Sequence, residues 1–208
     1  DQAQETIIVS LSNPSNMERL LDLALTIKRK NHNNPLYGLC VVDDDEAATE
    51  KLATAKQTLE RAGVRALSSG RKIETLATID NNISAGIKRV AREKNATDIL
   101  VGTSGKSGLA DFIFGRSLEQ LGENLSQNLF EYNPVNPINL YKKVLFILPP
   151  HAEKESKFVH VLDKVVRIAE VNAIPLETYS CDLTCREIEK HLRKTKSPVG
   201  RPRAGRQA

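Results

Sequence analysis

The residues best suited to binding a ligand form a glycine motif near the middle of the sequence. The motif has two short stretches separated by nine residues, Gly102-Thr103-Ser104-Gly105 and Gly115-Arg116-Ser117. Glycine lets the backbone come close to a ligand because it has no Cβ, and free backbone N–H groups in such a loop can hold phosphate oxygens. The pattern therefore predicts a nucleotide site. The alternative is a structural turn whose glycines let the following helix pack close to a sheet.

Other groups that could support chemistry follow no comparable pattern. The four histidines stand near no Ser or Cys at a recognisable nucleophile elbow, so a catalytic triad is not predicted. Cys181 and Cys185 lack a second ligand pair at zinc spacing. The acidic run over 43–46 fits no known cation-binding loop, and it is favourable at a helix start by itself. We therefore expect no enzyme activity and no metal ion.

The positive charge of the chain is concentrated at its end. The net charge is +4, but the stretch from Lys190 onward holds seven basic residues and no acidic ones, which leaves about −3 on residues 1–189. This distribution argues against nucleic acid as a partner. Three cysteines fit a reducing compartment better than a disulfide scaffold. The chain begins with Asp1 rather than Met, so we expect it to be a fragment of a longer protein.

Short apolar runs alternate with helical patterns through the first part of the chain, which predicts an α/β fold. The predicted sheet is five-stranded, parallel in type and Rossmann-like, with helices on both faces. Strands are expected over 6–11, 36–42, 99–101 and 129–132, with another that begins near Ile73 or is broken over 64–67 and 73–77. Helices are expected over 17–27 behind a capping box of Ser15 and Glu18, over 45–62, over 83–91 behind Asp80 or Asn81, and after Ser117. Ligands bind such sheets beyond the carboxyl ends of the strands, where the glycine motif lies.

The same pattern restarts after residue 142. The apolar run at Val144 follows the run at Ile7 by 137 residues, and Pro175 follows Pro35 by 140 residues. We therefore expect a domain over 1–134, a linker over 135–142, a truncated second copy over 143–197 and a disordered basic tail over 198–208. Half a sheet leaves an open strand edge, so we expect a homodimer, or pairing of the two domains within one chain.

The glycine motif, placed between a strand and a helix, resembles the nucleotide-binding signature of the universal stress protein family. The resemblance covers 5–134 as a complete domain and 142–197 as the first part of another. It implies a five-stranded α/β fold and ATP or another adenine nucleotide as the ligand. In the implied site, the phosphates are bound by Gly102, Gly105 and Gly115, and hydroxyl donors come from Thr103 and Ser104. Ser117 stands at the start of the following helix, and Val41 forms one wall of the base pocket.

Two positions depart from the family pattern. Ser12 stands where family members that bind nucleotide usually carry an Asp that contacts the nucleoside, and Arg116 stands where they usually carry Ser or Thr. The Ser12 hydroxyl still suits a hydrogen bond to a ligand, although a weaker one than a carboxylate makes. The Arg116 guanidinium suits a bidentate contact with phosphate, but it could also point to solvent or fill the space of the phosphates.

The tandem arrangement, with the 136–142 segment between the copies, resembles the carboxyl-terminal region of bacterial sodium/proton antiporters. That resemblance implies a regulatory nucleotide sensor on the cytoplasmic side. Its partner would be the membrane transporter part of the same parent chain, in the inner membrane. The competing hypothesis is a dimerisation or scaffold module of the same fold that binds no nucleotide.

Overall fold

The computed structural model describes residues 5–29, 35–103 and 119–199. Its contacts divide the chain into two compact units, Asp1–Val135 and Asn136–Ala208. Within the described residues, no helix is both long and apolar enough to cross a membrane.

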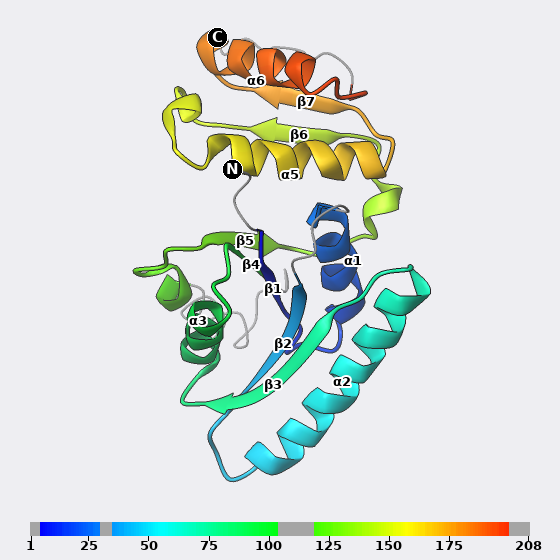
Figure 1. Cartoon of the computed structure of the whole chain (residues 1–208), viewed down its shortest axis with the longest axis vertical. Helices are drawn as coiled ribbons and strands as arrows, with labels where there is room; N and C mark the ends of the chain where they lie inside the picture. Colours follow the sequence, from blue (N-terminus) through cyan, green and yellow to red (C-terminus); the bar gives the residue numbers. More distant parts are fainter. Residues whose placement is uncertain (1–4, 30–34, 104–118, 200–208) are drawn as a thin grey trace. The chain divides into compact units, whose positions relative to one another are not determined.

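The first unit is built on a five-stranded parallel sheet (Figure 1). The strand order is β3-β2-β1-β4-β5, so β1 and β4 are the central pair. The strands are β1 (Ile7–Ser10), β2 (Leu36–Asp43), β3 (Glu74–Asp80), β4 (Asp98–Gly102) and β5 (Asn128–Tyr132). The helices are α1 (Met17–Ile27), α2 (Ala48–Ser68) and α3 (Ile83–Glu93), and residues 119–122 are also helical. The predicted α/β fold with a five-stranded parallel sheet is confirmed.

The helices cover the sheet in two layers (Figure 1). The chain runs outward from β1 to β3 and then returns past β1 to β4, so right-handed crossovers place α1 and α2 on one face and α3 on the other. The helices α1 and α2 accordingly contact each other. On the α3 face, Ile87 and Val90 pack against Ile8, Leu39 and Val41. The reversal between β1 and β4 creates the crevice at which ligands bind this class of sheet.

One predicted helix end and two predicted helix caps are wrong, whereas α1 and α3 begin where expected. The helix expected to end at residue 62 continues to Ser68, so 64–67 is helical and the third strand begins near Ile73, which is one of the two expected alternatives. Val64 and Leu67 are exposed, which shows that this end of α2 forms without burying those side chains. At α1 the N-cap is Asn16, and Ser15 Oγ donates to Asn13 Oδ1 (2.7 Å) rather than capping the helix. At α3 the N-cap is Asn82, whose Oδ1 accepts from the Ala85 N–H (2.8 Å).

The described part of the second unit contains two parallel strands and two α-helices. These are β6 (Val144–Ile147), α5 (Phe158–Val171), β7 (Leu176–Tyr179) and α6 (Asp182–Lys194), with short 3₁₀ helices η1 (Ile138–Leu140) and η2 (Ala152–Lys154). Its core includes Phe146, Leu162, Leu176 and Ile188. Val199, expected in the tail, is also buried in this core. The element order matches that of β1-α1-β2-α2, but a truncated second copy remains a prediction.

One face of the β6-β7 sheet lacks a cover among the described residues. Side chains alternate along β6, so Phe146 is buried whereas Leu145 and Ile147 are 52% and 70% exposed. Tyr179 at the end of β7 is also exposed. With the 137-residue offset, Leu145 corresponds to Ile8, which the α3 layer buries completely in the first unit. The second unit has no counterpart of α3 among its described elements.

Two helical glycines offer a matched test of the packing between α3 and the sheet. A Cβ on Gly86 in α3 would lie 2.5 Å from Val41 Cγ1, whereas a Cβ on Gly63 in α2 would meet nothing within 4 Å. Alanine favours a helix over glycine by about 1 kcal/mol, so Gly63→Ala should raise the free energy of unfolding by up to that amount. Gly86→Ala should instead lower it by about 1–3 kcal/mol because of overpacking. Urea unfolding measures both changes, and equal shifts would contradict this packing.

Candidate functional site

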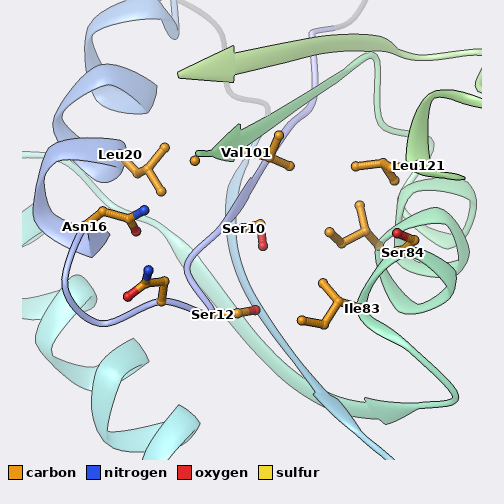
Figure 2. Close-up of a pocket in the computed structure, with 11 residues that line it drawn as sticks. Ser10, Ser12, Asn16, Leu20, Ile83, Ser84, Val101 and Leu121 are labelled. Atoms are coloured by element: carbon orange, nitrogen blue, oxygen red, sulfur yellow. The ribbon is translucent and has the colours of Figure 1, made fainter. Parts of the chain in front are cut away.

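A pocket lies at the carboxyl ends of the two central strands of the first unit (Figure 2). Its walls come from the ends of β1 and β4, the turn and first residues of α1, the start of α3 and the helical residues 119–122. The free volume is about 50 Å³. The lining residues are polar on the β1-α1 side and mostly apolar on the α3 side. The polar ones are Ser10, Ser12, Asn13, Asn16 and Ser84, and the others are Leu20, Ile83, Ile87, Val101, Gly102 and Leu121.

Ser12 lines the pocket as the sequence predicted, but its hydroxyl is already engaged by the protein. Ser12 Oγ accepts a hydrogen bond from the Val41 N–H (3.2 Å) and donates to the Val41 carbonyl (3.5 Å). One residue earlier, the Leu11 N–H bonds to the Leu39 carbonyl (2.8 Å). Ser12 therefore continues the pairing of β1 with β2 past the end of the strand.

Val41 lies beside Ser12 but not in the pocket lining. Its side chain is buried in the core between the sheet and α3, where it faces Gly86. Its backbone binds Ser12. The structure therefore places two predicted site residues in contact, because the Ser12 hydroxyl bonds to the Val41 backbone.

Gly102 lines the pocket and also has a packing role. A Cβ at this position would lie 2.7 Å from Asn16 Nδ2 and 2.7 Å from Leu20 Cδ1. The absence of a side chain therefore lets the first turns of α1 approach the end of β4. If the motif is only a structural turn, its glycines were expected to let the helix that follows the motif pack close to the sheet. The described contact of Gly102 is instead with α1, which precedes the motif.

The rest of the predicted site is only partly described. The Thr103 N–H donates to the Tyr132 carbonyl (2.9 Å), which extends the pairing of β4 with β5 by one residue. The remaining predicted site residues lie outside the described ranges. They are Ser104, Gly105, Gly115, Arg116 and Ser117.

Asn16 is a pocket residue that the sequence reasoning missed. It is only 9% exposed, and its Oδ1 has no hydrogen-bond partner in the described part of the chain. Its neighbour Asn13 differs, because Asn13 Oδ1 accepts from both the N–H (3.0 Å) and the hydroxyl (2.7 Å) of Ser15. The sequence did contain a signal for this residue, because an asparagine directly before the apolar pattern of α1 is a common N-cap. The interpretation of Ser15 and Glu18 as a capping box led to the choice of Ser15 as the cap instead.

Charge is absent from this pocket wherever its lining is described. Every described lining residue is apolar or a neutral Ser, Asn or Gly. The described lining therefore offers hydrogen-bonding and apolar groups but no partner for an ion pair.

With this geometry in view, the family assignment is direct. The model of the universal stress protein family matches residues 4–129. The match includes the whole of the sheet except the end of β5, together with the strand ends that form the pocket. The chain belongs to the universal stress protein family. A search of curated proteins finds no match.

Solved structures agree with this fold. A universal stress protein from Archaeoglobus fulgidus DSM 4304 is 13% identical, with 98% of this chain and 78% of that chain covered and a TM-score of 0.64. The cytoplasmic domain of a prokaryotic cation chloride cotransporter is 9% identical, with coverages of 99% and 80% and a TM-score of 0.59. Hypothetical protein MJ0577 is 15% identical, with coverages of 64% and 98% and a TM-score of 0.53. At such identities the likeness shows the fold alone.

The three thiols outside this pocket differ in the chemistry that their surroundings permit. Cys181, at the N-cap of α6, lies 3.2 Å from the Thr184 hydroxyl. This hydrogen bond, with backbone N–H groups of Thr184 and His151, lowers the pKa of the Cys181 thiol to about 7. Burial raises the pKa of Cys40 to about 12 and also raises the pKa of Cys185.

These thiol pKa values predict selective alkylation. Because the thiolate is the nucleophile, iodoacetamide should label Cys181 in the folded protein with a rate that is half-maximal near pH 7 and levels off only at higher pH. Labelling followed by mass spectrometry measures the rate for each cysteine. The Cys181→Ser variant should retain no fast-reacting thiol until it is unfolded. A midpoint near the ordinary thiol value of about 8.5 would contradict the prediction.

Proposed function

We propose that the chain binds ATP or another adenine nucleotide in the pocket of the first unit, and that this binding regulates a membrane transporter. The observation that carries the proposal is the position of Gly102. This residue lines the pocket at the end of β4 and is also the first glycine of the motif. A ligand seated in the pocket therefore adjoins the start of the segment whose sequence suits phosphate binding.

The chemistry of the pocket suits one part of a nucleotide. Its apolar wall includes Ile83, Ile87, Val101 and Leu121, which suit the faces of a base. Its free volume of about 50 Å³ is too small for a whole nucleotide, so the phosphates would extend out of the pocket over the glycine motif. In this arrangement the motif supplies the charge recognition that the described pocket residues do not.

The transporter part of the proposal rests on resemblance and on fold. The tandem sequence pattern resembles the carboxyl-terminal region of sodium/proton antiporters, and the fold is shared with the cytoplasmic domain of a cation chloride cotransporter. We place the chain on the cytoplasmic side of an inner membrane, as the nucleotide-sensing part of such a transporter. Bound nucleotide would bias the pairing of domains, because an effector acts through its different affinity for two states. The proposal includes no catalytic step and no metal ion.

Isothermal titration with ATP, ADP and AMP tests nucleotide binding. We expect heat of binding at ligand concentrations below about 1 mM, a common range for regulatory metabolite sites. Gly105→Val should abolish the heat because a side chain would block close approach of the phosphate. The matched control is Gly63→Ala, whose site in α2 faces open space, and it should bind like the unmodified protein. Folded protein that gives no heat with any of the three nucleotides would overturn the proposal.

A second candidate function is a dimerisation or scaffold module that binds no nucleotide. The observation in its favour is the uncovered face of the β6-β7 sheet, which exposes Leu145, Ile147 and Tyr179. In a sheet of only two strands, both strands are also edges, and open edges tend to pair. This face and these edges suit association with a second copy of the chain.

Association through the second unit predicts a mass that depends on concentration. Light scattering should show dimers that dissociate on dilution, and Ile147→Lys should shift the equilibrium to monomers because it places a charge on the exposed apolar face. Lys157→Ala, a change on the N-cap of α5 outside that face, serves as the control and should leave the mass unchanged. A monomer at every concentration would argue against self-association.

A further inference from the structure

We propose that Asn16 recognises the nucleotide by accepting a hydrogen bond from a ribose hydroxyl. In this role it replaces Ser12, the residue shortly after β1 at which the family resemblance places nucleoside recognition. This inference rests on the proposed nucleotide site. It identifies the residue that binds the ribose. Neither the family signature nor the glycine motif specifies that residue.

The first observation is an unsatisfied polar atom in the pocket wall. Asn16 is nine-tenths buried, and its Oδ1 has no partner among the described residues. Figure 2 shows its side chain pointing from the start of α1 into the pocket. A buried carbonyl without a donor is costly, and buried polar groups are normally satisfied. A ligand donor at this position would remove the deficit.

The second observation is that two neighbouring side-chain acceptors between β1 and α1 are already used. The Ser12 hydroxyl both accepts from and donates to the Val41 backbone. Asn13 Oδ1 accepts two hydrogen bonds from Ser15. Ser12 is the position at which the family resemblance places nucleoside recognition, yet its hydrogen-bonding capacity serves the sheet. Recognition of the nucleoside therefore belongs to Asn16, four residues further along the chain.

The third observation is the position of Asn16 relative to the glycine motif. A Cβ on Gly102 would be 2.7 Å from Asn16 Nδ2, so the amide lies directly against the first glycine of the motif. With the base among the apolar residues and the phosphates on the motif, the ribose occupies the space between them. An amide oxygen is neutral and accepts hydrogen bonds, which matches a sugar hydroxyl rather than a phosphate oxygen.

The position of Asn16 at the start of α1 does not account for its amide side chain. Asn16 is the N-cap of α1 but makes no side-chain capping hydrogen bond. Its replacement by the similarly shaped leucine therefore removes no cap. The same replacement removes the unsatisfied carbonyl, so the ligand-free protein should be as stable as before or more stable.

The test compares Asn16→Leu with Ser12→Ala in titrations with ATP and 2′,3′-dideoxy-ATP. Asn16→Leu should weaken ATP binding at least tenfold without lowering the melting temperature. Ser12→Ala should lower the melting temperature, because it breaks the link to Val41, and change affinity less than twofold. The unmodified protein should bind the dideoxy analogue about tenfold more weakly than ATP, and Asn16→Leu should not distinguish the two.

Each contrary outcome has a definite meaning. If the unmodified protein binds ATP and Asn16→Leu binds it equally well, the role of Asn16 is overturned while the proposed function stands. If Ser12→Ala loses as much affinity, recognition belongs to Ser12. If Asn16→Leu does not fold, equal binding of ATP and the dideoxy analogue by the unmodified protein still overturns the inference. Weaker binding of inosine triphosphate alone would assign the donor to the base amino group instead. No binding of any nucleotide overturns both proposals.

Discussion

The close approach of α1 to the end of β4 is the constraint on which the site depends. It exists because Gly102 has no side chain, so that Asn16 and Leu20 occupy the space where a Cβ would otherwise lie. That contact fixes the first turn of α1 beside the central strand pair β1 and β4. It also brings the polar turn after β1 and the start of the glycine motif to one end of the sheet. The pocket is a consequence of this packing.

The same contact changes what the glycines of the motif mean. Gly102 would be required for packing whether or not a nucleotide binds, so its presence alone does not distinguish a ligand site from a structural turn. Asn16 does distinguish them. Packing explains why a glycine faces Asn16, but it does not explain why the buried side-chain carbonyl of Asn16 has no donor in the described part of the chain. The polar deficit is therefore the stronger argument for a ligand, although the glycines are more visible in the sequence.

The sequence predicted the strands and the fold because buried parallel strands leave long apolar runs, such as 36–42. It failed at the end of α2 and at the helix caps, where the sequence signals are local and ambiguous. The segment 64–67 has an apolar pattern that suits a strand, yet it extends α2 with Val64 and Leu67 exposed. The described pocket lies at the carboxyl ends of the strands, where the sequence placed a ligand site, and the site itself stays a prediction. The bond of Ser12 to the Val41 backbone, and the lack of a partner for Asn16 Oδ1 among the described residues, depend on contacts between distant segments, which no spacing in the sequence encodes.

The two units are incomplete in different ways, and this difference bears on regulation. The sheet of the first unit has helices on both faces, and its pocket holds a polar atom that lacks a donor among the described residues, which a small ligand can satisfy. The described part of the second unit has no helix layer over Leu145 and Ile147, and such an exposed apolar face suits a protein surface. Anything that binds only the folded state stabilises it, so a nucleotide and a protein surface would each stabilise a different unit. A nucleotide can then influence assembly only if the two units are energetically coupled.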